Sequence, residues 1–166
     1  IIIGAGQAGL AMSKHLTDRS IDHVLLERGE VANSWKTERW NSLQLLTPNW
    51  QSRLPDYYYN GNDPDGFMNM KQLVSFLDGY AEHIDAPVHQ RTTVLSVQRR
   101  FGRYIVKTSR GNWTCSSLVL ANGACSVASI PKISESIPTS IRQMSPLEYK
   151  TPDQLEAGGV LVVGAS

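Results

Sequence analysis

The sequence has little cysteine, no excess of charge and no long apolar run, and each of these absences excludes a class of protein. Its two cysteines, Cys115 and Cys125, form neither a CxxC redox pair nor a metal-ligand pattern. The formal net charge is +1, with basic and acidic residues interspersed, so we expect no binding of nucleic acid. No stretch approaches the roughly 18 to 20 apolar residues that span a bilayer, and no basic leader precedes the first glycine. We therefore expect a cytoplasmic protein without a membrane partner.

Histidine is also sparse, and its arrangement suggests neither a metal nor an activated nucleophile. His15, His23, His83 and His89 have no acidic or serine partner at a suggestive spacing, and no His, Cys and carboxylate residues cluster at metal-ligand spacing. We therefore expect no metal site. The composition of the 166 residues, 41% apolar and 19% charged, is typical of a globular protein of one domain or slightly more.

Apolar runs that alternate with a helical pattern predict an α/β fold. Residues 1–3 are a β-branched run that ends at Gly4, which is typical of a buried parallel strand. Residues 8–17 have apolar side chains at helical spacing, and residues 22–27 read as the next buried strand. Together they form a βαβ unit, which implies a parallel sheet. A second helix is predicted over residues 69–83, whose apolar side chains form one stripe.

The middle of the chain predicts a long loop and an antiparallel meander. Residues 41–67 are rich in proline, glycine and aromatic residues and are too many for a simple connection. This loop is expected either to line a site or to lie on the surface, held by aromatic anchors. Residues 94–97, 104–108 and 113–120 are strand-like segments separated by glycine turns, and the last is expected to return to the core.

Residues 4–9, Gly-Ala-Gly-Gln-Ala-Gly, match the pattern GxGxxG between a predicted strand and a predicted helix. The first glycine makes the tight turn, the second lets the backbone approach a pyrophosphate, and the third allows close helix packing. The anion is held by free N–H groups and the positive end of the helix dipole. The alternative is a glycine-rich turn in an unrelated α/β protein.

Glu27 strengthens the nucleotide interpretation, because it ends the second predicted strand about 20 residues after the turn, where a carboxylate accepts hydrogen bonds from a ribose diol. The joint pattern predicts a site for the ADP half of a dinucleotide, and Glu27 disfavours a 2′-phosphate there. Glu27 alone does not separate FAD from NAD, since both have two free ribose hydroxyls on that half.

Further motifs give a resemblance to a known family. They are the glycine turn at residues 4–9, the Glu27-Arg28 pair, Trp35, Arg39-Trp40, and residues 45–50, 63–68 and 120–123. On these motifs the chain resembles the flavin-containing monooxygenase and Baeyer-Villiger monooxygenase superfamily along essentially its whole length, and especially the bacterial FAD-dependent oxidoreductases of that group. The resemblance implies an FAD/NAD(P)-binding Rossmann-like parallel sheet with an antiparallel β-meander, and FAD and NADP as cofactors.

Residues 120–123, Leu-Ala-Asn-Gly, look like the second flavoprotein motif, usually Ala-Thr-Gly, with Asn122 in place of Thr. The alternative for this motif is a plain turn after a strand. No catalytic residue is assigned, because the cofactor carries the chemistry. The cofactor-binding residues implied by the glycine turn and the resemblance are Gly4, Gly6, Gln7, Ala8, Gly9, Glu27, Arg28, Trp35, Ala121 and Gly123.

The end of the chain repeats the pattern of its beginning. Residues 158–163 read as a fresh buried strand that ends at Gly164, as the first strand ends at Gly4. The resemblance implies that residues 1–157 are the N-terminal part of an FAD-binding domain and that residues 158–166 open an NADP-binding domain. We therefore expect an incomplete, two-dinucleotide-binding-domain flavoprotein that is inactive as this excerpt.

The expected function of the parent protein is that of a monooxygenase-like NAD(P)H-dependent oxidoreductase, which reduces FAD with NADPH and acts on a small-molecule substrate. Ser145 stands where the superfamily has a motif histidine, so monooxygenation itself is left open. The alternatives are a disulfide reductase of the same architecture, a single-site NAD dehydrogenase and a non-catalytic FAD-binding module. No sequence feature assigns the substrate, the preference between NADPH and NADH, or the oligomeric state.

Overall fold

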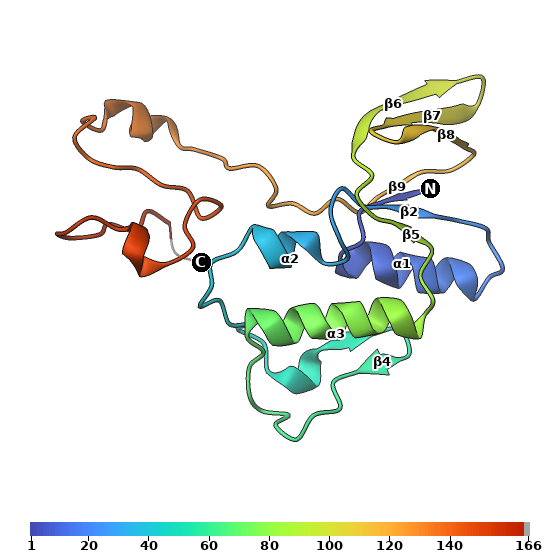
Figure 1. The fold of residues 1–166 in the computed structure, drawn as a ribbon, viewed down its shortest axis with the longest axis horizontal. Helices are drawn as coiled ribbons and strands as arrows, with labels where there is room; N and C mark the ends of the chain where they lie inside the picture. The colour runs from blue at the N-terminus through green and yellow to red at the C-terminus, as the bar shows by residue number, and fades with distance from the viewer. Residues whose placement is uncertain (165–166) are drawn as a thin grey trace.

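The beginning of the chain forms the βαβ unit that its sequence predicts. In the computed structural model, which describes residues 1–164, β1 (Ile2–Ile3) leads into α1 (Gln7–Thr17), and the chain returns in β2 (Leu25–Leu26) parallel to β1. β5 (Val88–His89) and β9 (Val119–Leu120) complete a parallel sheet in the order β5-β2-β1-β9 (Figure 1). In this order β2 lies on one side of β1 and β9 on the other, so the direction in which strands are added to the sheet reverses at β1.

The core lies between this sheet and two helices. Ile2 and Leu25 of the sheet and Leu10 of α1 are fully buried, as expected for strands that are covered on both faces. The second predicted helix is α3 (Met70–His83), which begins with a capping box. The Asn69 side chain accepts a hydrogen bond from the Gln72 amide at 3.0 Å, and the Gln72 side chain accepts one from the Asn69 amide at 2.9 Å, which satisfies two free helix donors.

One face of α3 is buried against the rest of the core. Its buried residues Leu73, Leu77 and Tyr80 recur at helical spacing. Burial raises the pKa of Tyr80 to about 12, and its hydroxyl has no hydrogen-bond partner among residues 1–164. Tyr57 packs against Tyr80 with ring centroids 5.3 Å apart, so the long loop is attached to α3 by an aromatic contact.

The predicted meander forms a separate antiparallel sheet. β6 (Val94–Arg100), β7 (Arg103–Thr108) and β8 (Gly111–Cys115) are paired in that order. The segment predicted as one strand over residues 113–120 is instead divided between β8 and β9, because its end pairs with β1 of the parallel sheet. The His89 and Trp113 rings meet edge to face at 4.8 Å, which joins the two sheets.

The remaining elements are short. α2 (Asn33–Thr37) follows β2, and the long loop contains a turn of 3-10 helix, η1 (Asn49–Gln51), before the hairpin of β3 (Arg53–Leu54) and β4 (Tyr57–Tyr58). Two further 3-10 turns, η2 (Lys132–Ser136) and η3 (Pro152–Gln154), lie in the last part of the chain. No helix of residues 1–164 has both the length and the apolar character needed to cross a bilayer.

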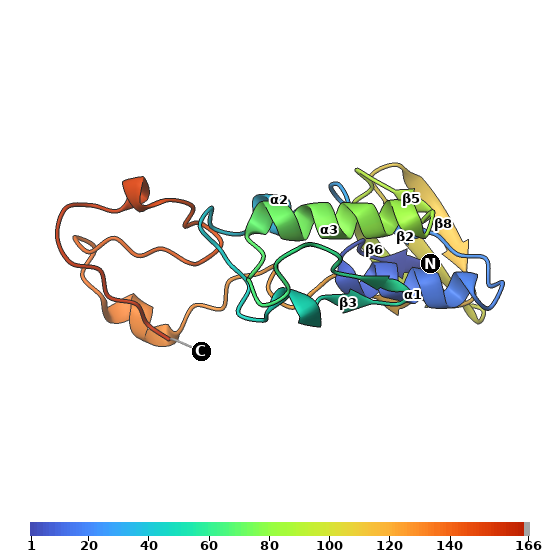
Figure 2. The ribbon, with the colours of Figure 1, turned by 90° about the horizontal axis from the view of Figure 1, so that it is seen from below.

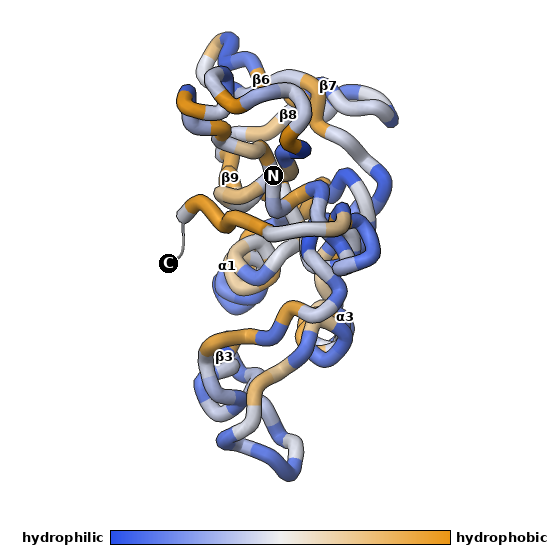
Figure 3. The backbone as a smooth tube through the Cα atoms, turned by 90° about the vertical axis from the view of Figure 1, so that its left-hand side faces the viewer, coloured by the Kyte–Doolittle hydropathy of each residue, from blue (hydrophilic) through white to orange (hydrophobic). Residues whose placement is uncertain are grey.

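Residues 123–164 form an arm that extends away from the parallel sheet (Figures 1 and 2). The expected buried strand over residues 158–163 is not formed: no described strand pairs with it, and the side chains from Val160 to Val163 are 61% to 87% exposed. The physical reason is that a two-sided apolar strand needs hydrogen-bonding neighbours and covered faces, which residues 1–164 do not supply there. Figure 3 shows this run as a hydrophobic stretch before the C-terminus. The turn expected beyond Gly164 lies outside the described residues.

The packing of α3 predicts a difference between two leucine substitutions. Leu77 is 2% exposed in the core, whereas Leu46 is 89% exposed. Leu77→Ala should lower the free energy of unfolding by about 2 to 5 kcal/mol, because it removes buried methyl groups and leaves a cavity. Leu46→Ala should change it by no more than about 0.5 kcal/mol. Urea titration of both variants measures these values, and equal losses would contradict the packing of α3.

Candidate functional site

The glycine turn lies at the carboxyl end of β1, where the winding of the sheet reverses. Open α/β sheets bind ligands outside the carboxyl ends of their strands at such a point. Gly4 has a φ of +103°, which favours glycine, and its amide donates to the Leu26 carbonyl at 2.9 Å. The N-terminus of α1 follows directly and has no side-chain cap, so its first N–H groups have no partner within the helix.

The three glycines of the turn have different surroundings. A Cβ on Gly4 would lie 2.5 Å from the Ala121 carbonyl oxygen, and a Cβ on Gly9 would lie 2.0 Å from the Gly4 carbonyl oxygen. These two glycines therefore allow the turn to contact β9 and α1 closely. A Cβ on Gly6 would meet nothing within 4 Å. The space beside Gly6 is open, as the approach of a ligand to the backbone requires.

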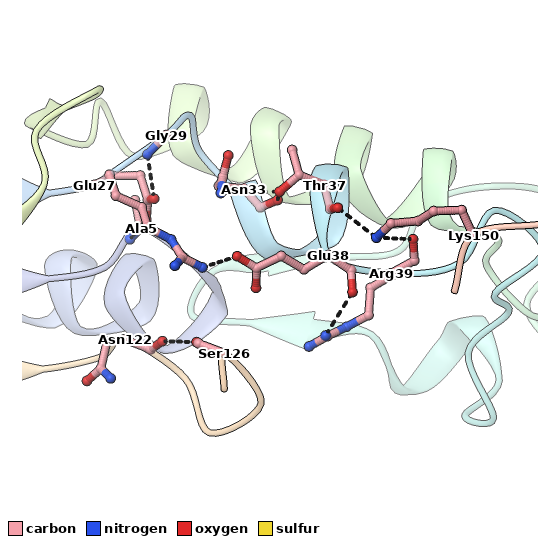
Figure 4. Close-up of polar contacts among 11 residues, drawn as sticks. Ala5, Glu27, Gly29, Asn33, Thr37, Glu38, Arg39, Asn122, Ser126 and Lys150 are labelled. Carbon is pink, nitrogen blue, oxygen red and sulfur yellow. Dashed lines mark hydrogen bonds and ion pairs between the residues drawn. The ribbon is translucent and has the colours of Figure 1, made fainter. Parts of the chain in front are cut away.

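The Glu27 side chain points toward the turn and holds it (Figure 4). One carboxylate oxygen accepts a hydrogen bond from the Ala5 amide at 2.9 Å, and the other accepts one from the Gly29 amide at 2.9 Å. The residue is only 7% exposed. Each carboxylate oxygen has more than one lone pair, so Glu27 can hold the turn and still accept a bond from a ligand hydroxyl.

A cleft of about 1000 Å³ opens in front of the turn, at the upper end of the range for ligand pockets. Its walls come from the ends of β1, β2 and β9, from the start of α1 and from α2. Gly9 is the one sequence-predicted site residue that does not line the cleft, because it is buried under the turn. The predicted residues that do line it are Gly4, Gly6, Gln7, Ala8, Glu27, Arg28, Trp35, Ala121 and Gly123.

Three arginines and one carboxylate, Glu27, give the cleft a net positive lining. Arg28 pairs with Glu38, which lies just after α2. The Arg39 guanidinium lies 5.3 Å from the centroid of the Trp35 ring, close enough for a cation–π interaction. Arg53 reaches the cleft from the β3 hairpin. Such a lining favours an anionic ligand, and arginine forks match phosphate oxygens well.

One part of the wall, at residues 92–93, was not predicted from the sequence, whereas a second part comes from the long loop of residues 41–67, which was expected either to line a site or to lie on the surface. Thr92 and Thr93, between β5 and β6, line the cleft, and the Thr92 amide donates to the Glu27 carbonyl at 2.8 Å. Arg53, Leu54 and Pro55 line it from the long loop. That loop therefore both contributes to the site and is anchored by aromatic packing. Neither part matches a sequence motif, and only the strand order brings them to the turn.

His23 has a serine partner in the structure, although no sequence spacing suggested one. Its Nε2 lies 2.7 Å from the Ser13 hydroxyl, and its Nδ1 lies 2.8 Å from the Ile21 carbonyl oxygen. Ser13 is only 1% exposed and lies outside the cleft, so the pair fastens α1 to the connection before β2. In residues 1–164, no group of three or more His, Cys, Asp or Glu residues is placed to hold a metal, and Cys115 and Cys125 are both free.

Comparison with known proteins gives one family and several relatives. The family described as pyridine nucleotide-disulphide oxidoreductase matches residues 1–166. An uncharacterized CzcO-like oxidoreductase of Geobacillus kaustophilus is 35% identical over 166 residues, which are 99% of this chain and 47% of that protein. The probable indole-3-pyruvate monooxygenase YUCCA7 of Arabidopsis thaliana is 27% identical over 176 residues, which are 99% of this chain and 41% of that protein. The chain thus spans less than half the length of these relatives.

Solved structures share the fold. A flavin-containing monooxygenase from Stenotrophomonas maltophilia matches with a TM-score of 0.68 and 24% identity, over 79% of this chain and 40% of that one. The protein OTEMO, in a complex with FAD and NADP, matches with a TM-score of 0.65 and 19% identity, over 79% of this chain and 26% of that one. The resemblance to flavin-containing monooxygenases and the predicted α/β fold class are therefore confirmed.

The hydrogen bonds of Glu27 predict that it stabilises the protein even without a ligand. Glu27→Gln replaces one acceptor oxygen by an amide group that cannot accept, so the Ala5 or Gly29 amide loses its partner. The free energy of unfolding should fall by about 1 to 3 kcal/mol. The control is Glu30→Gln, since the Glu30 carboxylate makes only long surface contacts, 3.5 Å to Lys36 and 3.6 Å to Arg91, which are worth about 1 kcal/mol or less. Denaturant unfolding without nucleotide measures both, and equal effects would contradict this role of Glu27.

Proposed function

Since the chain belongs to the pyridine nucleotide-disulphide oxidoreductase family, we propose that the protein containing it is a monooxygenase-like FAD-dependent oxidoreductase that reduces bound FAD with NADPH. The observation that carries this proposal is the open space beside Gly6, at an uncapped helix N-terminus and in a cleft with a net positive lining. The similarity to the oxidoreductase of Geobacillus kaustophilus and to the monooxygenase of Arabidopsis thaliana supports the reaction class.

The residues of the turn fit the ADP half of FAD. A diphosphate beside Gly6 would accept hydrogen bonds from the free N–H groups at the start of α1 and would face the positive end of its dipole. Glu27, held toward the turn, would accept a hydrogen bond from a ribose hydroxyl. Arg39 and Trp35 would form the opposite wall. When bound, FAD supplies the redox chemistry, and the protein supplies position, polarity and the exclusion of water.

We further propose that residues 1–157 belong to the FAD-binding domain and that residues 158–166 begin the NADP-binding domain. The exposed apolar side chains from Val160 to Val163 support this division, because such a run is expected to be covered in the longer protein. We expect residues 1–166 alone to show no turnover, since they span less than half of the relatives compared. The substrate class proposed is a small molecule.

A disulfide-reductase activity is the alternative closest to the family description. It requires two cysteines that form a redox pair near the flavin. Cys125 lines the cleft, but Cys115 lies in β8 and does not line it, and both thiols are free. The residues 1–164 therefore favour the monooxygenase-like proposal.

The direct test is the absorbance of the full-length protein. We expect it to be purified with yellow FAD that loses its visible absorbance when NADPH is added without oxygen. Bound FAD that NADPH and NADH leave unchanged would favour the non-catalytic FAD-binding module. A protein that binds NAD and no flavin would favour the single-site dehydrogenase, and either result would overturn the proposal.

The open space beside Gly6 predicts a variant that loses FAD and not its fold. Gly6→Ala should leave the free energy of unfolding nearly unchanged, because the added Cβ meets nothing within 4 Å. It should weaken FAD binding roughly tenfold or more, since the methyl group holds the diphosphate away from the backbone, and a tenfold loss corresponds to about 1.4 kcal/mol. Gly159→Ala is the control, as its Cβ also meets nothing and it lies in the arm. Flavin fluorescence titration of the apoprotein measures the affinity, and equal affinities of the two variants would argue against a diphosphate at Gly6.

A further inference from the structure

We propose that Lys150 is a positioning residue that holds the arm of residues 123–164 against residues 37–41, beside the dinucleotide cleft, and so keeps Arg39 in place in the wall of that cleft. The inference rests on the proposed function, because it concerns how that site is kept in place. Within residues 1–164, every hydrogen bond that joins the arm to residues 1–121 involves Lys150.

Lys150 makes three bonds to one short segment, residues 37–41. Its ammonium group donates to the Thr37 carbonyl at 2.8 Å and to the Arg39 carbonyl at 3.3 Å. Its own carbonyl accepts a hydrogen bond from the Asn41 amide at 2.9 Å. Figure 4 shows the Lys150 side chain reaching these carbonyl groups. Lys150 is therefore far from this segment in the sequence but supplies the donors that a residue close to the end of a helix would otherwise supply.

One of the two bonded carbonyl groups, that of Thr37, belongs to the last residue of α2, and the other, that of Arg39, lies two residues beyond it. α2 ends at Thr37, and the last carbonyl groups of a helix accept no hydrogen bond from within the helix. A lysine ammonium group is a suitable donor there, because it has three N–H groups and interacts well with the negative end of a helix. Lys150 thereby fixes the direction in which the chain leaves α2.

That direction decides where Arg39 lies. Arg39 is bound by Lys150 through its carbonyl, and its guanidinium group stacks on Trp35 in the wall of the cleft. A shift of the backbone at residue 39 would move the Arg39 side chain relative to Trp35 and to the glycine turn. Lys150 does not line the cleft, so it acts on the site only through this segment.

The residues of the arm that surround Lys150 are joined to one another by hydrogen bonds. The Gln154 side-chain oxygen accepts from the Lys150 and Thr151 amides, at 2.5 and 3.1 Å. The Ser145 amide donates to the Glu148 carboxylate at 2.7 Å, and hydrogen bonds from the side chain and the amide of Ser145 lower the pKa of Glu148. These hydrogen bonds within residues 145–154 therefore hold the backbone from which the Lys150 side chain extends. The segment lies a few residues before the proposed NADP-binding segment.

The test compares three variants of the full-length, FAD-loaded protein. Lys150→Met keeps the length of the side chain and removes its donors, and Lys150→Arg keeps the charge and the donors. Lys132→Met removes a lysine elsewhere on the arm, in η2, whose side chain makes no hydrogen bond or ion pair within residues 1–164. At saturating NADPH we expect Lys150→Met to slow flavin bleaching roughly tenfold, because misplacement of reacting groups by an ångström costs rate more than affinity. Lys150→Arg should restore most of the rate, and Lys132→Met should match the wild type.

A second readout needs no NADPH. Hydrogen–deuterium exchange of Lys150→Met should rise in residues 37–41 and in residues 145–154 together, while exchange in α3 stays unchanged. Unchanged exchange in both segments, or a wild-type bleaching rate in Lys150→Met whatever its melting temperature, would overturn the inference. A wild-type protein that NADPH does not bleach would instead count against the proposed function, and the exchange measurement would still decide the role of Lys150.

Discussion

The site depends on one buried carboxylate that joins the glycine turn to the end of the neighbouring strand. Glu27 accepts one hydrogen bond from the Ala5 amide and one from the Gly29 amide, each at 2.9 Å. Without it, the buried Ala5 amide and the partly buried Gly29 amide, in the turns after β1 and β2, would have no partner, which costs free energy. The same carboxylate faces the place where the ligand is proposed to lie. Glu27 therefore both stabilises the glycine turn and faces the proposed position of the ligand.

The strand order explains why so many different segments reach this carboxylate. β2 and β9 lie on opposite sides of β1, so the chain leaves their carboxyl ends in different directions and opens a cleft between them. The close contact of Gly4 with the Ala121 carbonyl brings the turn after β9 to the same place. The long loop and the connection before the meander then complete the wall with Arg53 and Thr92. A site of this kind is formed more by the backbone at the ends of strands than by reactive side chains.

The two ends of the site are held by different kinds of contact. At the glycine turn, packing is so close that a single Cβ on Gly4 or Gly9 would meet backbone within 3 Å. At the far wall, α2 and Arg39 are connected to the arm by the hydrogen bonds of one lysine. Close backbone packing fixes the turn, and the hydrogen bonds of Lys150 fix the segment that follows α2.

Part of this arrangement can be predicted from local sequence, and the rest depends on contacts between distant segments. The glycine spacing, Glu27 at the end of an apolar run and the stripe of residues 69–83 determined by themselves the βαβ unit, the glycine turn and α3, because each depends on neighbours within a few residues or on one crossover. The apolar run at residues 158–163 showed the opposite case, since a buried strand needs partners that the described residues do not provide. The pairing of β9 with β1, the place of Thr92 and the bonds of Lys150 to the end of α2 were decided only by the tertiary structure. They join residues that are far apart in the chain, and no local propensity encodes which distant segments will meet.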